Sequence, residues 1–193
     1  MENLYKSIYH IFGAIYVPKD LRHSNALVHI SDTPSFIYKA IIKMIKKIKP
    51  RVIIHTGDIV DDIKLEIRPQ LIEVYKKEAN KFINEISKYA ELIILVPGNH
   101  DDFTKLRLKD NVKILNEGDV FIFDGIKLGL SHKYENLPLN CDFYLYGHDK
   151  NCLNDYYLNG IKNINVIKDK KIFKLCYPIG TDNYRLKISR MGK

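Results

Sequence analysis

Between residues 26 and 96 the sequence alternates short β-branched runs with longer runs of helical periodicity, and few folds accommodate this order. The short runs cover residues 26–31, 52–56 and 92–96, and the longer runs cover residues 34–48 and 63–89. In 34–48 the apolar residues recur every three or four positions, so they form one stripe of a helix. Short strands joined by helix-length connections are typical of parallel strands with crossover helices. The pattern therefore predicts an α/β fold.

After residue 110 the chain changes to short strands separated by turn residues. The strand candidates lie at residues 112–115, 120–123, 126–130, 143–146, 161–167, 171–177 and 185–188. Turn pairs such as Asp124-Gly125 favour hairpins between them. We expect a parallel half followed by a mainly antiparallel half, within one domain that spans residues 1–193.

Two segments outside the strands carry separate expectations. Residues 1–25 are predicted to form an amphipathic helix or arm that packs on the domain. The helical segment at residues 61–90 is long for a connection between neighbouring strands, and it follows a polar motif. It either caps a cleft at that motif or packs as an ordinary structural helix.

The composition limits the surroundings and the partners of the chain. Lys and Arg total 31 against 23 Asp and Glu, which gives a formal charge of +8 and attraction to anions on average. The basic residues are dispersed, which is also typical of solvated helix faces. No apolar stretch approaches the roughly 20 residues that span a bilayer, and the three cysteines form no close-spaced pair. We predict a cytoplasmic protein without an integral membrane segment.

Five of the strand-like runs stop at a residue that can bind a metal ion. These residues are Asp32, Asp58, Asn99, His132 and His148. In open α/β sheets, ligands bind in the crevice beyond the carboxyl ends of the strands. The five endings therefore predict one shared crevice.

Carboxylate, amide oxygen and imidazole together form the ligand set of divalent manganese, iron, zinc, cobalt or nickel. Gly57, Gly98 and Gly147 directly precede three of the candidate ligands. A residue without Cβ permits a sharp exit from a strand and a close approach of the backbone. The pattern predicts a divalent-metal site.

These stretches resemble the motifs of the calcineurin-like metallophosphoesterases, also called metallo-dependent phosphatases. The family pattern is Asp-x-His, Gly-Asp-x-x-Asp, Gly-Asn-His-Asp or Glu, a lone His at a strand end, and Gly-His-x-His. The matching stretches are Asp32-Thr33-Pro34, Gly57-Asp58-Ile59-Val60-Asp61, Gly98-Asn99-His100-Asp101, Ser131-His132 and Gly147-His148-Asp149-Lys150. The resemblance covers residues 26–150 and implies a four-layer α-β-β-α sandwich of two mixed sheets.

The resemblance also implies a site for two metal ions. The residue matching Asp58 bridges both ions, and residues matching Asn99, His132 and His148 hold the second ion. The first ion is held by the residue matching Asp32 and by two histidines. In this chain Pro34 and Lys150 stand at the positions of those two histidines.

This departure from the family pattern predicts one or two ions per chain, with the second site favoured. Proline has no donor atom for a metal, and a lysine bound to metal would have to lose its proton. One hypothesis is that the Lys150 ammonium replaces the first ion beside Asp32 and Asp58. The alternative is that Lys150 points to solvent.

The resemblance assigns catalysis to His100, whose family counterpart assists departure of the leaving group. Asp61 and Asp101 are the candidates to orient such histidines. His29 and His55 lie three residues before a predicted ligand, which puts them on the opposite face of a strand. We expect both to be structural, with His29 the nearer replacement for a lost ligand.

Three functions stay open at this point. The first is a metal-dependent phosphoesterase that hydrolyses a phosphomonoester or phosphodiester of a phosphorylated small molecule or nucleotide. The second is a degenerate, non-catalytic family member that binds a ligand or a protein. The third is a nuclease, which the positive charge permits but which lacks clustered Arg and aromatic residues.

Overall fold

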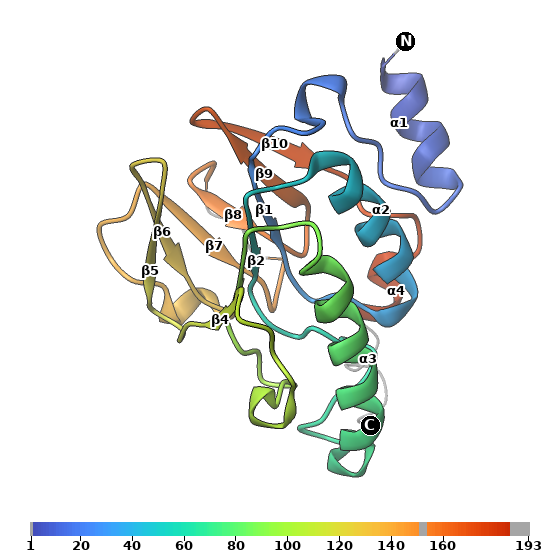
Figure 1. Cartoon of the computed structure of the whole chain (residues 1–193), viewed down its shortest axis with the longest axis vertical. Helices are drawn as coiled ribbons and strands as arrows, with labels where there is room; N and C mark the ends of the chain where they lie inside the picture. Colours follow the sequence, from blue (N-terminus) through green and yellow to red (C-terminus); the bar gives the residue numbers. More distant parts are fainter. Residues whose placement is uncertain (1, 151–153, 186–193) are drawn as a thin grey trace.

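The computed structural model describes residues 2–150 and 154–185, with two β-sheets at its centre (Figure 1). The first sheet has the order β10-β9-β1-β2-β3-β4. Its strands are β1 (Leu27–Ile30), β2 (Val52–His55), β3 (Leu92–Leu95), β4 (Val112–Ile114), β9 (Ile164–Lys168) and β10 (Lys171–Leu175). Strands β1 to β4 pair in parallel, with Ile30 opposite His55 and His55 opposite Leu95. The C-terminal ends of β1, β2 and β3 therefore meet at one edge.

The second sheet has the order β5-β6-β7-β8. Its strands are β5 (Val120–Phe123), β6 (Ile126–Leu130), β7 (Phe143–Tyr146) and β8 (Tyr157–Asn159). The hairpin of β5 and β6 is antiparallel as expected, but β6 with β7 and β7 with β8 pair in parallel. Strands β9 and β10 also form an antiparallel pair, so the expectation of a mainly antiparallel second half is wrong only for β6, β7 and β8, which run in the same direction.

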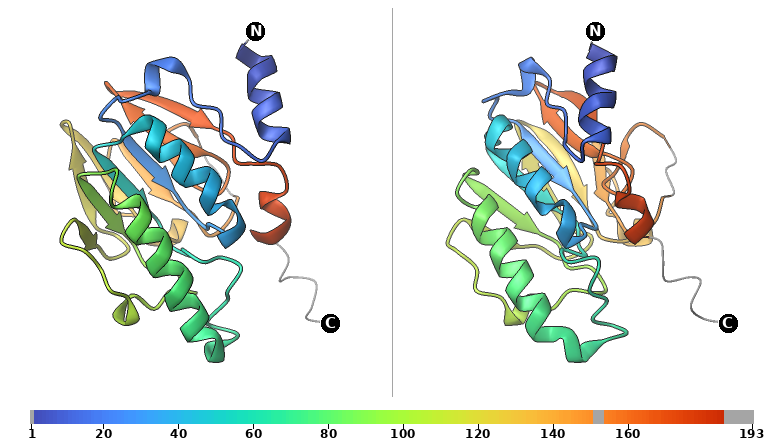
Figure 2. Two further views of the ribbon diagram at one scale, coloured as in Figure 1. Left: turned by 45° about the vertical axis from the view of Figure 1, so that its right-hand side comes forward. Right: turned by 90° about the vertical axis from the view of Figure 1, so that its right-hand side faces the viewer.

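Helices cover the outer face of the first sheet, as the two views of Figure 2 show for α2 and α3. The α-helices are α1 (Glu2–Ile11), α2 (Tyr38–Ile48), α3 (Ile72–Ile86) and α4 (Thr181–Arg185), and the 3-10 helices are η1 (Lys19–Leu21), η2 (Ser35–Ile37), η3 (Pro69–Leu71), η4 (Phe103–Lys105) and η5 (Tyr134–Asn136). The apolar stripe of α2 is buried, and its left-handed C-cap at Lys49 ends the helix. No helix in the described ranges is long and apolar enough to cross a membrane.

Apolar side chains fill two layers, one between the helices and the first sheet and one between the sheets. In the second layer, Leu27 and Ile54 of the first sheet pack with Leu128, Leu130 and Leu145 of the second. Successive side chains of a strand point to opposite faces, so β1 and β2 contribute to both layers. The predicted α/β class, with two mixed sheets packed together, is confirmed.

The outer face of the second sheet is covered by tyrosines and by the loop that contains η5. The Tyr134 ring packs against those of Tyr146 and Tyr157, and Tyr157 stacks on Tyr144. In the described part of the chain this loop stands where the resemblance implies an outer helical layer.

The segment at 61–90 is helical only in its second part, where α3 begins at Ile72. Arg68 precedes Pro69 and has φ −131° and ψ 65°, outside the helical region, so no helix continues through it. Asp62 bonds to both the backbone and the hydroxyl of Ser35, which ties the non-helical part to the start of η2.

Two further predictions differ from the structure near the C-terminus. Strand β8 at Tyr157–Asn159 had no counterpart among the predicted strands. The strand expected at 185–188 begins with the last residue of α4, and its other positions lie outside the described residues. At the other end, α1 followed by η1 agrees with a helix or arm, and Lys47 Nζ lies 5.2 Å from the centre of the Tyr9 ring.

Candidate metal centre

The five predicted ligands follow five different strands and come together at one edge of the two sheets. Asp32, Asp58 and Asn99 follow β1, β2 and β3 of the first sheet, and His132 and His148 follow β6 and β7 of the second. Parallel pairing within each sheet brings these strand ends to the same side. The five strand ends therefore lie at one edge of the fold, as the sequence predicts.

His132 lies at the centre of this group and is 1% exposed. Its Nδ1 is 2.7 Å from the backbone oxygen of Thr56, which can only accept, so Nδ1 is the donor. In the neutral ring this leaves a lone pair on Nε2. Such a hydrogen bond fixes the tautomer that binds metal in proteins.

The Nε2 atom of His132 faces three other acceptor atoms. It lies 3.2 Å from Asn99 Oδ1, 3.2 Å from His148 Nδ1 and 3.7 Å from Asp58 Oδ2. Single donor atoms of Asp32, Asp58 and His132 also lie within 4.8 Å of one another. Polar atoms that converge in this way share a positive charge, either a proton on a ring nitrogen or a bound cation. The donor set therefore fits one divalent ion held by Asp58, Asn99, His132 and His148.

Burial disfavours a negative charge on Asp58. Burial and then the neighbouring Asp32 carboxylate raise the pKa of Asp58 to about 8. For His132, burial opposes protonation, but the Asp32 and Asp58 carboxylates outweigh it and raise the pKa. With a pKa of about 8 the Asp58 carboxyl takes up a proton at neutral pH, and a cation bound beside it would favour the ionised form instead.

The backbone at three of the ligands adopts the left-handed conformation. Asp32 has φ 49°, Asp58 has φ 53° and His148 has φ 64°. This conformation disfavours residues with a Cβ, and such strain is concentrated at functional sites. It turns each side chain back towards the strand ends.

The three glycines before the ligands are required because neighbouring groups approach them closely. A Cβ on Gly57 would lie 2.5 Å from His132 Nδ1, and one on Gly98 would lie 2.3 Å from Asp58 Oδ1. A Cβ on Gly147 would lie 1.9 Å from Ser31 Oγ and 2.3 Å from Asp32 Oδ2. The close approach predicted for these glycines therefore occurs between one strand end and the next.

Asp101 has a different role from the predicted one of orienting a histidine. Its Oδ2 accepts hydrogen bonds from the backbone N–H groups of Asp58 and Gly98, and its Oδ1 accepts from Ile59 N and the Tyr75 hydroxyl. Charged acceptors form strong bonds with backbone N–H groups. Asp101 thus fastens the loop after β2 to the loop after β3.

His100 lies beside the ligands, with its backbone N–H bonded to Asp58 Oδ1 at 3.1 Å. Burial and then the Lys64 ammonium lower the pKa of its imidazole to about 4. At neutral pH the ring is therefore uncharged and offers an N–H hydrogen bond.

Glu66 was not among the predicted site residues. Its Oε2 accepts from Asn99 Nδ2 at 2.6 Å and lies 3.6 Å from His100 Nδ1. It is exposed within a charged stretch, so no local pattern separates it from a solvated glutamate.

The positions expected to hold a first ion lack a matching donor set. Pro34 caps η2. Lys150 Nζ pairs with Asp182 Oδ2 at 2.6 Å rather than with Asp32 and Asp58, so the proposed replacement by Lys150 is corrected. A different ammonium, that of Lys64, bonds to Asp61 and lies 3.9 Å from Asp58 Oδ2. These residues do not fit a second divalent ion.

His29 and His55 form hydrogen bonds away from the ligands. His29 Nε2 lies 2.9 Å from Thr56 Oγ1, and His55 Nε2 lies 2.9 Å from Thr33 Oγ1. Both side chains are buried. Both histidines therefore have the contacts of structural residues, and His29 does not lie in position to replace a lost ligand.

Comparisons with known proteins identify the family of the sequence. The sequence model of the family described as calcineurin-like phosphoesterase matches residues 26–184. Among solved structures, Yfce, a phosphoesterase from E. coli, is similar at 14% identity and a TM-score of 0.48, covering 79% of this chain and 98% of that chain. The search of curated proteins gave no match.

Proposed function

Because the chain belongs to the calcineurin-like phosphoesterase family, we propose that it is a metal-dependent enzyme that hydrolyses a phosphomonoester or phosphodiester. The observation that supports this proposal is the convergence of Asp58, Asn99 and His148 on the Nε2 atom of His132. These four residues would hold one divalent ion of manganese, iron, zinc, nickel or cobalt. When bound, such an ion polarises the phosphoryl group and lowers the pKa of water.

The other residues of the site act on the bound ester. His100 is uncharged and donates an N–H hydrogen bond to the oxygen of the departing group, where negative charge develops. Asp101 keeps the loops after β2 and β3 in register. Segment 61–71 borders the site through Lys64 and Glu66 and would limit the size of the ester that enters.

The proposed substrate is a phosphorylated small molecule or a nucleotide in the cytoplasm. A formal charge of +8 attracts anions, and three cysteines without a close-spaced pair in the sequence suit a reducing compartment.

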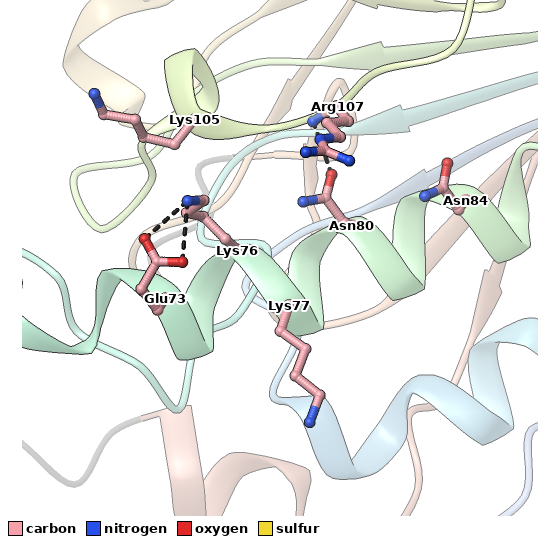
Figure 3. A pocket seen from close by; sticks show the side chains of 7 residues that line it. All are labelled: Glu73, Lys76, Lys77, Asn80, Asn84, Lys105 and Arg107. Atoms are coloured by element: carbon pink, nitrogen blue, oxygen red, sulfur yellow. Dashed lines mark hydrogen bonds and ion pairs between the residues drawn. The ribbon is translucent and has the colours of Figure 1, made fainter.

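The nuclease alternative receives little support from the basic groove on α3. This groove has a volume of about 660 Å³ and is lined by Glu73, Lys76, Lys77, Asn80, Asn84, Lys105 and Arg107. Figure 3 shows Lys76 paired with Glu73 and Lys77 pointing away from Lys105 and Arg107. The positive charges do not converge as a nucleic-acid groove requires.

A binding module without catalysis remains the second candidate, because Pro34 and Lys150 replace two histidines of the family pattern. Turnover of chromogenic esters distinguishes the two candidates. We expect hydrolysis of p-nitrophenyl phosphate or bis-p-nitrophenyl phosphate when manganese, nickel or zinc is supplied. Removal of a metal ligand or of the hydrogen bond to the leaving group should each lower kcat/KM by about 100-fold or more.

The variants for this test are Asn99→Ala and His100→Ala, with Asn116→Ala as a control at an exposed position outside the site. The control should retain wild-type kcat/KM. Absence of turnover with every metal and both esters would favour the binding module.

A further inference from the structure

Lys64 places a positive charge beside Asp58, the residue that matches the bridge between the two ions of the family pattern. Its Nζ bonds to Asp61 Oδ1 and lies 3.9 Å from Asp58 Oδ2. The side chain is only 12% exposed. A lysine this enclosed is not an ordinary solvated surface charge.

The carboxylate that Lys64 binds is itself buried. Asp61 is 1% exposed, and within the described residues its Oδ2 has no hydrogen-bond partner. The backbone N–H of Asp61 bonds to the Thr33 oxygen, which anchors it beside the segment that follows Asp32. Asp61 was predicted to orient a histidine; the group it binds is the Lys64 ammonium.

A second positive side chain, that of Arg185, contacts the backbone at Asp32. Arg185 of α4 donates from Nε to the Asp32 backbone oxygen at 2.6 Å, and its guanidinium also bonds to the oxygens of Ser31 and Ile161. The guanidinium of Arg185 is hydrogen-bonded to backbone carbonyls, whereas the Lys64 ammonium faces the carboxylates of Asp58 and Asp61. Of these two charges, Lys64 is the one that meets the Asp58 side chain.

We propose that the Lys64 ammonium takes the place of the first metal ion, so that the centre combines one divalent ion with one fixed positive charge. The inference rests on the proposed function, because it assigns Lys64 a role within that site. The ammonium balances Asp58 and Asp61, and it repels a second divalent ion. Its three N–H donors also suit an anionic phosphate oxygen bound beside the first ion.

The competing explanation is that Lys64 only braces segment 61–71 through its ion pair with Asp61. The two explanations predict opposite changes in metal affinity when the charge of Lys64 is removed. If Lys64 supplies charge, its neutralisation removes repulsion and tightens the binding of a divalent ion. If Lys64 braces the loop, its loss loosens the ligands and weakens the same binding.

The experiment measures manganese and phosphate binding by titration calorimetry, with electron paramagnetic resonance to distinguish single ions from coupled pairs. Wild type should bind one Mn²⁺ per chain. Lys64→Gln keeps a hydrogen-bond donor for Asp61 but removes the charge. We expect Mn²⁺ to bind at least about tenfold tighter, and inorganic phosphate at least about tenfold weaker to the Mn²⁺-loaded protein. Lys64→Arg keeps the charge and should restore phosphate binding.

Lys76→Gln is the matched control, because Lys76 also pairs with an acidic residue three positions earlier but lies on α3 in the groove of Figure 3. It should leave both affinities unchanged. Two Mn²⁺ ions per wild-type chain, seen as a coupled pair, would overturn the role of Lys64 and leave the proposed function intact. This readout needs no variant, so it decides even if Lys64→Gln does not fold.

The remaining outcomes also separate the two proposals. One outcome is that wild type binds one ion per chain while Lys64→Gln binds both Mn²⁺ and phosphate more weakly. That result would show that Lys64 only stabilises segment 61–71. No Mn²⁺ bound by wild type would remove the proposed metal-dependent function itself, and the role of Lys64 with it.

Discussion

His29 and His55 lie close to the centre along the chain, yet the structure uses them as uncharged core residues. Thr56 forms a hydrogen bond with one ring nitrogen of His29, and Asn165 lies at the other ring nitrogen. Thr33 forms a hydrogen bond with one ring nitrogen of His55. Burial lowers the pKa of His29 to about 3 and that of His55 well below its ordinary value. A histidine that avoids protonation in the folded state makes stability depend on pH.

The free energy of unfolding should therefore decrease as the pH falls below about 6.5. In that range the unfolded chain takes up a proton on His29, whereas the folded chain takes it up only near pH 3. The stabilisation is fully present above pH 6.5, and each such histidine removes about 1.4 kcal/mol per pH unit below it.

The variant His29→Gln isolates this contribution. Between pH 7 and pH 5 its free energy of unfolding should decrease by about 2 kcal/mol less than that of wild type. Urea denaturation with a chelator present measures the difference. Equal decreases in both proteins would show that His29 is not the neutral group described here.

Among the structural elements, the ends of β1 and β7 are in closest contact at Gly147. The Ser31 hydroxyl and the Asp32 carboxylate occupy the space that a Cβ on Gly147 would need. His148 N, one residue further on, donates to Asp32 Oδ2 at 3.1 Å. The two sheets thus contact each other through the side chains of Ser31 and Asp32 on one side and the backbone at Gly147 and His148 on the other, where no room remains for a methyl group.

Gly147→Ala should separate these strand ends and weaken the centre. We expect a loss of about 1–3 kcal/mol in the free energy of unfolding from overpacking, together with weaker Mn²⁺ binding because Asp32 and His148 move apart. Chemical denaturation and Mn²⁺ titration measure both effects.

Gly125→Ala is the comparison for this variant. Gly125 has φ 77°, and nothing lies within 4 Å of its Cβ position, so the change should cost about 1–2 kcal/mol from backbone strain alone. It should leave Mn²⁺ affinity unchanged. A similar loss of Mn²⁺ affinity in both variants would mean that the contact at Gly147 does not position the ligands.

At the scale of the whole molecule, the centre links the two sheets. Asp58 and Asn99 extend from the first sheet, and His132 and His148 extend from the second. The unfolded chain does not hold these residues together, so an ion that binds all four binds only the folded state. Such an ion stabilises the protein by mass action.

Manganese at about 100 times its dissociation constant should add about 2.7 kcal/mol of stability. For a chain of this size that corresponds to an increase in Tm of about 5–10 °C. Thermal denaturation with Mn²⁺ and with a chelator measures it. Asn99→Ala should lose most of the shift and Asn116→Ala should keep it. An equal shift in both variants would place the stabilising ion elsewhere on the protein.

The sequence by itself determined the parallel strands β1, β2 and β3 and the order of the candidate ligands. Their runs of apolar residues and the glycine-containing motifs that follow are local patterns, and backbone geometry converts each into a strand that ends at a polar residue. The predicted ranges 26–31, 52–56 and 92–96 extend beyond the observed strands by one residue, at both ends of β1 and at the C-terminal ends of β2 and β3. Convergence then follows, because parallel strands end at the same edge.

The tertiary structure alone decided which partners the polar side chains take and how the second sheet pairs. Lys64 rather than Lys150 lies beside Asp58, and Asp101 binds backbone N–H groups rather than a histidine. The course of the loops decides which partners a long lysine or a short aspartate side chain can reach. The parallel pairing of β6 with β7 and of β7 with β8 depends on packing between the sheets. No local periodicity encodes either, because both depend on contacts between residues distant along the chain.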